Sequence, residues 1–137
     1  MSLFVDTSAW YAAADSDDHS NEDAKRILSQ GDRLITTDHV LIETWLLMRH
    51  RLHRVAAEQF WEALRSGAAL VESVGTADLE AAWSIGQTFA DQDFSIVDRM
   101  SFAVMQRLGI QRVATFDKDF AIYRFGPNRR RAFEVVR

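Results

Sequence analysis

The sequence predicts an α/β fold, a three-layer sandwich in which a short central parallel sheet of four to five strands is flanked by helices. The apolar runs that could form strands are short and continuous, and they alternate with stretches of helical periodicity. Glycines such as Gly31, Gly67 and Gly109 separate these segments. Strands without polar alternation are typical of parallel sheets that helices cover on both faces.

The first half of the chain contains two predicted strands and four predicted helices. Ser20, with Asp23 three residues later, is a capping-box pattern, and Asp38 is the expected cap of a later helix. The helix over 39–52 is apolar nearly all round, so we expect it to be deeply buried or to pack on another chain. The predicted order is strand 3–6, a helix capped by Thr7 or Ser8, helix 20–30, strand 34–36, helix 39–52 and helix 55–65.

The second half continues the same alternation. It contains strand 69–74, a helix capped by Thr76 that runs to about 91, helix 96–108, strand 113–116 and a fifth strand over 133–136. No repeat, low-complexity tract or linker interrupts the 137 residues. We therefore expect a single domain over 1–137.

Composition narrows the function classes. The chain has no cysteine, which excludes disulfides, thiolate metal sites and thiol nucleophiles. No signal peptide is visible, and no apolar stretch approaches the roughly 18 residues of a membrane span. We expect a cytoplasmic protein with no membrane association.

The formal net charge of −4 does not by itself indicate nucleic-acid binding. Clustering matters more than the total, and basic residues gather over 49–54 and 129–131. Each run is either a solvated face or a surface that contacts phosphates.

Four acidic residues occur where the predicted fold would bury them: Asp6, Glu43, Asp98 and Asp117. Asp6 closes the first strand and Asp117 follows the fourth, while Glu43 and Asp98 share helix faces with apolar residues. Carboxyl ends of parallel strands meet at one edge of the sheet, and helix N-termini tolerate anions, so one rim can collect all four. Unpaired buried carboxylates are rarely tolerated, which predicts a site that holds a cation.

Each acid also has a local explanation, although these do not account for the joint placement. The local alternatives are a capping box of Asp98 with Ser95, a helix cap for Asp6, pairing of Glu43 with His39 or His50, and a turn role for Asp117.

Electrostatics favours a hard cation at such a rim. Two carboxylates about 4 Å apart repel by roughly 4 kcal/mol at an effective dielectric constant near 20. Oxygen ligands without cysteine or a histidine cluster favour Mg²⁺, with Mn²⁺ as the alternative. Such an ion can activate water and neutralise charge on phosphorus.

Four motifs together resemble the PIN-domain family, and more narrowly the VapC-type toxins of bacterial toxin–antitoxin pairs. They are Asp6 to Ala9 after the first strand, Glu43 in its helix, Ser95 to Asp98, and Thr115 to Phe120. The resemblance spans nearly the whole chain. It implies a PIN-like three-layer fold and a Mg²⁺-dependent endoribonuclease that hydrolyses RNA phosphodiester bonds.

The resemblance also implies roles for the acids. Asp6 and Asp98 would be the direct metal ligands. Glu43 would hold a water of the ion or help to deprotonate the attacking one, and Asp117 would support a ligand or a second metal. The family has a further acid before the Asp98 position, for which Asp91 and Asp93 are candidates, and membership of Asp119 stays open.

The partners implied by the resemblance are RNA, a second copy of the chain in a homodimer, and a small antitoxin. The antitoxin would wrap a groove near the second and third helical regions and insert a basic residue towards the acids. Trp10, Trp45 and Trp61 either serve that surface or belong to the core. Arg99 either contacts the scissile phosphate or pairs locally, and local pairing is the expectation.

Two other functions compete with the nuclease. The first is a non-catalytic PIN-fold scaffold or an RNA- or protein-binding module, which need not keep four acids. The second is a phospho-accepting signalling domain. That class needs a lysine on a separate loop, and Lys25 and Lys118 fit this pattern poorly.

Overall fold

Five parallel strands form one sheet in this computed structural model, which describes all residues from 1 to 137. The strands are β1 (Ser2–Val5), β2 (Arg33–Thr37), β3 (Leu70–Glu72), β4 (Arg112–Ala114) and β5 (Glu134–Val136). They are arranged in the order β3-β2-β1-β4-β5. The predicted parallel sheet is confirmed, including its fifth strand.

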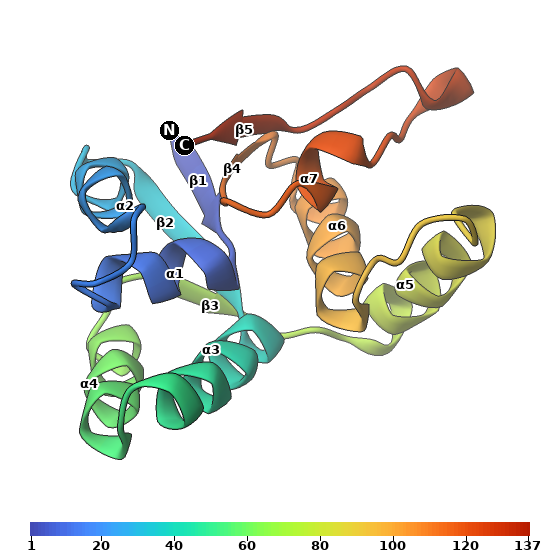
Figure 1. Cartoon of the computed structure of the whole chain (residues 1–137). Coiled ribbons are helices and arrows are strands. Elements are labelled where there is room, and N and C mark those ends of the chain that lie inside the picture. The colour runs from blue at the N-terminus through green and yellow to red at the C-terminus, as the bar shows by residue number, and fades with distance from the viewer.

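Seven helices surround the sheet, and Figure 1 shows α1, α2 and α4 on one side of it and α6 and α7 on the other. Their bounds are α1 (Thr7–Ala14), α2 (Asn21–Leu28), α3 (Asp38–Arg51), α4 (Arg54–Arg65), α5 (Thr76–Thr88), α6 (Ile96–Leu108) and α7 (Asp119–Ile122). The short helix α7 was not predicted. None of the seven is long and apolar enough to cross a membrane.

Four predicted helix caps are wrong in detail. Asp6, not Thr7 or Ser8, is the N-cap of α1. Thr37, not Asp38, caps α3, because its hydroxyl accepts a hydrogen bond from the Val40 N–H at 3.0 Å. Gly75, not Thr76, is the N-cap of α5. Ser20 occupies the N-cap position of α2 without a side-chain capping bond, so no capping box forms there. Each error moves a helix start by at most two residues and leaves the element order intact.

The helix α3 is not deeply buried, so of the two expectations for it, packing on another chain remains a prediction. Val40, Thr44 and Met48 are buried, but Ile42 and Leu46 on the opposite side are 53% and 58% exposed. The apolar residues of α3 therefore form two faces. One face packs in the core, and the other is exposed to solvent.

The tryptophans divide between core and surface. Trp10 is buried in the core, Trp45 is half-buried, and Trp61 on α4 is 44% exposed beside the outward face of α3. Trp83 on α5, which the sequence pattern did not single out, is 62% exposed.

The core holds α6 firmly against the sheet. Leu3, Phe4 and Val5 of β1 are fully buried, and so is Phe102 of α6. The Phe102 ring stacks on Tyr123 with 4.3 Å between centroids. Burying a large apolar side chain contributes roughly 1.5–3 kcal/mol, so this contact fixes the helix whose first turn carries Asp98.

The strand order places a crevice at the carboxyl end of β1. The chain passes from β1 through β2 to β3 on one side, and then returns to β4 on the other side of β1. Such a reversal leaves space between the connections that leave the two central strands, and α/β proteins bind ligands there. Asp6 is the first residue beyond β1 and therefore lies at this point.

Candidate active site

Asp6 is held in one orientation by the end of β1 and the loop after β4. Its N–H donates to the Ala114 carbonyl at 3.1 Å, and its side chain is 2% exposed. The Oδ2 atom accepts hydrogen bonds from Thr115 Oγ1 at 2.9 Å and Ser8 Oγ at 3.1 Å. The Oδ1 atom is buried and has no hydrogen-bond partner. Burial raises the pKa of Asp6 to about 6, although the bond from Thr115 partly opposes the shift.

Asp98 lies in the first turn of α6 and is 4% exposed. Its N–H donates to Ser95 Oγ at 3.1 Å, so Ser95 caps α6, but no return bond from the Ser95 N–H to the Asp98 carboxyl group completes a capping box. Burial, followed by the negative charges of Asp6 and Asp117, raises the pKa of Asp98 to about 9. In the absence of a cation this carboxyl group therefore holds a proton at neutral pH.

Asp117 reaches the same point from the loop after β4. Its N–H donates to Thr115 Oγ1 at 3.0 Å, and its Oδ1 accepts from the Asp119 N–H at 2.9 Å, so Asp117 is a turn residue as well. One carboxylate oxygen each from Asp6, Asp98 and Asp117 lies within 4.8 Å of the other two. If all three were ionised, each pair would repel by about 3–4 kcal/mol at an effective dielectric constant near 20.

Glu43 stands in the same pocket but outside this group of three. The Thr7 hydroxyl donates to its Oε1 at 2.6 Å. Neither His39 nor His50 pairs with it, so that alternative is wrong; His39 contacts Asp38 instead. Thr7 directly follows Asp6, so the same short stretch of backbone positions the Asp6 side chain and, through the Thr7 hydroxyl, the Glu43 carboxylate.

The pocket that contains all four acids has a volume of about 410 Å³. Asp18, Asp93 and Asp119 also line it, whereas Asp91 does not. Burial, together with the charge of Asp117, raises the pKa of Asp119. The structure thus favours Asp93 over Asp91 as the additional acid.

Arg51 is the only lysine or arginine that lines this pocket. Its guanidinium carbon lies 5.4 Å above the ring centroid of Tyr11, and the Tyr11 hydroxyl donates to Asp15 at 2.7 Å. Arg51 forms no ion pair, unlike Arg54 of the same basic run, which pairs with Glu58 at 3.2 Å. Stacking on an aromatic face holds an arginine in place while leaving its hydrogen-bond donors available.

Arg99 does not form the expected local pair. It forms no ion pair with an acid and does not line the pocket. Its guanidinium lies against α5, where a Cβ atom added to Gly86 would come within 1.8 Å of Arg99 Nη1. The expectation of local pairing is therefore wrong, and the arginine of α6 packs against Gly86 of α5 instead.

The arrangement suits a hard divalent cation. Three carboxylates converge from β1, α6 and the loop after β4, and the buried Asp6 Oδ1 atom lacks a hydrogen-bond donor. Such an oxygen is costly unless a ligand completes its coordination. Oxygen donors of this kind are preferred by Mg²⁺, which binds through one or two carboxylates and keeps positions for phosphate oxygens.

The sequence pattern missed the residues that orient the acids. Thr7, Ser8 and Thr115 all donate to a site carboxylate. A signal was present, because Thr7 and Ser8 are the two residues after the acid that closes the first strand, and Thr115 directly follows β4. Arg51 could not be selected from its run, because helical periodicity alone does not say which of its basic residues faces the pocket.

Comparisons with known proteins agree with this geometry. The family model of the PIN domain matches residues 3–126. A protein of Mycobacterium tuberculosis described as "23S rRNA-specific endonuclease VapC20" is 40% identical over 121 residues, covering 87% of this chain and 92% of that protein.

Solved structures show the same fold. The crystal structure of Mycobacterium tuberculosis VapC20, described as a sarcin-ricin loop cleaving toxin, has a TM-score of 0.82 at 37% identity and covers 88% of this chain and 93% of its own. VapBC2 of Rickettsia felis, bound to a promoter DNA fragment, has a TM-score of 0.67 at 9% identity, covering 89% of this chain and 92% of its own. At that identity the likeness concerns the fold alone. The chain belongs to the PIN domain family, in which it is a relative of the VapC toxins.

Proposed function

We propose that this protein is a Mg²⁺-dependent endoribonuclease, the toxin component of a toxin–antitoxin pair, and that residues 1–137 form a single nuclease domain. The observation that carries the proposal is the convergence of Asp6, Asp98 and Asp117 within 4.8 Å, with a buried Asp6 oxygen that no donor satisfies. A scaffold has no need for three carboxylates that repel one another in a pocket open to solvent.

Asp6 and Asp98 are the proposed metal ligands, and Asp117 supports them. A bound Mg²⁺ would supply Lewis-acid stabilisation of the charge that develops on the phosphoryl oxygens. The protein's own part is to orient the acids: Thr115 and Ser8 occupy one oxygen of Asp6 and leave the other for the ion. Asp98 must lose its proton when the ion binds, so binding of the cation becomes tighter as pH rises.

Glu43 is the proposed proton acceptor for the attacking water. It stands in the pocket without belonging to the group of three, so it can face a water molecule rather than the ion. The hydroxyl of Thr7 fixes the orientation of its carboxylate in the pocket. Arg51 is the proposed contact for the phosphate beside the scissile bond, because it is the pocket's one guanidinium and has no acidic partner.

The proposed substrate is 23S ribosomal RNA, at its sarcin-ricin loop. The support is the description of VapC20, a relative 37–40% identical over most of both chains. We also propose a homodimer in the cytoplasm and a small antitoxin as partner. The exposed apolar residues Ile42 and Leu46 on α3 and Trp61 on α4 suit such a protein partner.

A cleavage assay tests the proposal. Purified protein is incubated with a sarcin-ricin loop transcript and with an unrelated hairpin, in Mg²⁺ and in chelator. We expect cleavage of the first transcript only in Mg²⁺, and its loss on Asp6→Ala or Asp98→Asn. Asp23→Asn is the matched control, since Asp23 is exposed on α2 and pairs only with Arg26. Equal cleavage with chelator, or full activity of Asp98→Asn, would refute a metal-dependent nuclease.

A further inference from the structure

Four arginines gather in the segment between α7 and β5. Residues 120–133 contain Arg124, Arg129, Arg130 and Arg131 and no acidic residue. Arg129, Arg130 and Arg131 are all exposed, and none forms an ion pair within 4.0 Å or donates a side-chain hydrogen bond to the protein. We call residues 124–131 the arginine loop. Most of it lies beyond residue 126, where the PIN match ends.

The backbone of the arginine loop is closed on itself. Phe125 and Arg131 exchange two backbone hydrogen bonds, both of 3.0 Å. Between them Gly126, Asn128 and Arg129 have positive φ angles of 75°, 58° and 52°. Such angles are uncommon for arginine, so the loop has a defined conformation that its closing contacts maintain.

Aromatic rings hold two of the arginines in place. The Arg131 guanidinium lies 5.1 Å above the Phe125 ring, and the Arg129 guanidinium lies 5.3 Å above Phe89. A Cβ atom at Gly126 would come within 2.8 Å of Arg131 Cδ, so this stacking requires glycine. A stacked guanidinium loses little further freedom when its edge binds a phosphate.

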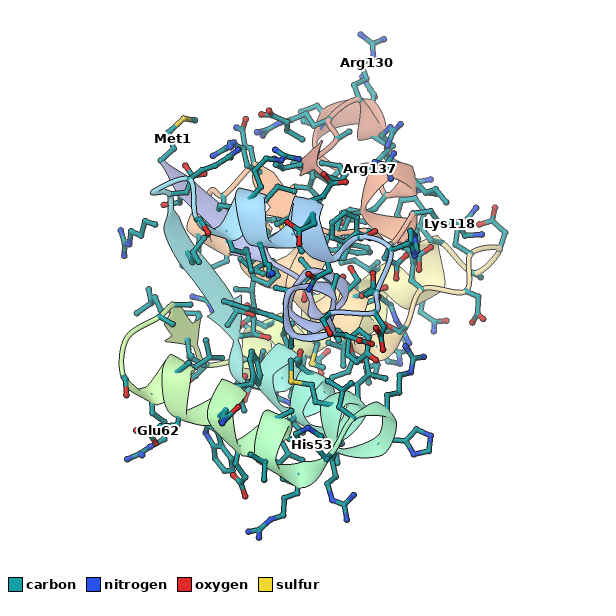
Figure 2. All side chains as sticks on the ribbon, turned by 60° about the vertical axis from the view of Figure 1, so that its left-hand side comes forward. Met1, His53, Glu62, Lys118, Arg130 and Arg137 are labelled. Atoms are coloured by element: carbon teal, nitrogen blue, oxygen red, sulfur yellow. The ribbon has the colours of Figure 1, made fainter.

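Two aromatic rings connect the arginine loop to the segment that borders the acidic pocket. Phe89, beneath Arg129, packs against Phe94 with 5.8 Å between centroids. Phe94 stands between Asp93 and Ser95, which both line the pocket. Arg130 is not stacked, and Figure 2 shows its side chain extending away from the body of the molecule.

We propose that the arginine loop is a second contact site for the RNA backbone, outside the catalytic pocket. The inference rests on the proposed nuclease function. A pocket lined by seven carboxylates in a chain of net charge −4 repels a polyanion, so a productive RNA complex needs cationic contacts beyond the pocket. Unpaired guanidinium forks match phosphate oxygens bidentately. An acidic protein segment is less suited, because the loop exposes no large apolar side chain as an anchor.

The test measures RNA binding apart from cleavage. Arg130→Glu is compared with Arg33→Glu, both in an Asp98→Asn background with chelator, by fluorescence anisotropy on a labelled sarcin-ricin loop transcript with flanking helix. Arg33 is exposed, has no ion pair and stands at the start of β2, at the opposite end of the sheet from the pocket. Arg33→Glu therefore makes the same charge change as Arg130→Glu, but away from the pocket. Arg130→Lys tests whether charge suffices.

We expect Arg130→Glu to weaken RNA binding about tenfold at 150 mM salt and to reduce the slope of log affinity against log salt by about one. Arg33→Glu should change neither, and Arg130→Lys should recover most of the affinity. Equal effects of Arg130→Glu and Arg33→Glu would refute the arginine loop as a site, as would unchanged RNA affinity with weakened binding of the antitoxin. Failure of the nuclease itself would show separately, as no Mg²⁺-dependent cleavage by the unmodified protein.

Discussion

Thr115 donates its hydroxyl hydrogen to Asp6 Oδ2 at 2.9 Å, although the two residues are 109 positions apart in the sequence. The same hydroxyl oxygen accepts the Asp117 N–H at 3.0 Å. One buried threonine therefore orients two of the three carboxylates and directs the free Asp6 oxygen towards the proposed ion.

Replacing Thr115 with Val keeps the shape but removes this hydroxyl. We expect Mg²⁺ or Mn²⁺ to bind about tenfold more weakly, which is usual when a residue that orients a metal ligand is lost. The hydrogen bond from Thr115 lowers the pKa of Asp6, so without it a proton competes more strongly with the ion for this carboxylate. Calorimetric titration measures this. Thr36→Val is the control: Thr36 is equally buried and donates to the Val5 carbonyl at 2.9 Å, but it does not line the pocket. Equal affinity losses in both variants would contradict the prediction.

The raised pKa of Asp98 predicts how stability depends on pH when no cation is bound. The folded protein keeps this proton up to about pH 9, whereas the unfolded chain loses it near pH 3.8, so the folded state binds more protons in between. The free energy of unfolding should therefore fall as pH rises through this window, by at most about 1.4 kcal/mol per pH unit from this group.

Urea unfolding in chelator at several pH values checks this dependence. Asp98→Asn should flatten the fall above about pH 6, where Asp6, whose pKa is raised to about 6, has largely titrated. Asp23→Asn should keep the slope of the unmodified protein. A slope that Asp98→Asn leaves unchanged would show that another group carries the proton.

Arg51 should matter for substrate binding where its neighbour Arg49 does not. Loss of a charge-assisted hydrogen bond to phosphate typically costs 1.5–3 kcal/mol, so Arg51→Met should raise KM for RNA on the order of tenfold or more. Arg49, on the same helix, is exposed and does not line the pocket, which makes Arg49→Met the matched control. Steady-state kinetics that shift equally in both variants would remove Arg51 from the site.

Arg107 should contribute to stability through a buried partner. Its guanidinium donates to both oxygens of Asp78 at 2.9 and 3.0 Å and to Glu72 at 3.1 Å, and Asp78 is 4% exposed. Arg107→Met leaves Asp78 buried without its cation, so we expect about 2–3 kcal/mol of destabilisation at pH 7. Arg65→Met breaks an exposed pair with Glu62 and should change stability by less than about 1 kcal/mol.

The difference between these two variants should also depend on pH. The Arg107 hydrogen bonds lower the pKa of Asp78 below its ordinary value of 3.8. The stabilisation is therefore present at neutral pH and is lost only as pH falls through that lowered pKa. A difference between the variants that stays the same down to the lowest pH at which the protein is folded would contradict an ionic origin.

The sequence by itself determined the element order, the parallel sheet and the four acids of the pocket. These follow from local patterns: apolar runs too short for helices, helical periodicity between them, and acids placed directly after strands or in the first turns of helices. Helix caps were less predictable, because Thr37 and Asp38 are both good caps and only the hydrogen bond to Val40 distinguishes them.

Only the tertiary structure decided which acids share a point and what orients them. Asp6, Asp98 and Asp117 converge because β1 lies between β2 and β4, a pairing between segments far apart in the sequence. The same strand pairing brings Thr115 next to Asp6. Packing of the helices and loops also places Arg51 over the Tyr11 ring and Arg129 over the Phe89 ring. Contacts of this kind depend on how the elements pack against one another. Helical or strand periodicity predicts which face of an element is buried, but not which residue of another element it contacts.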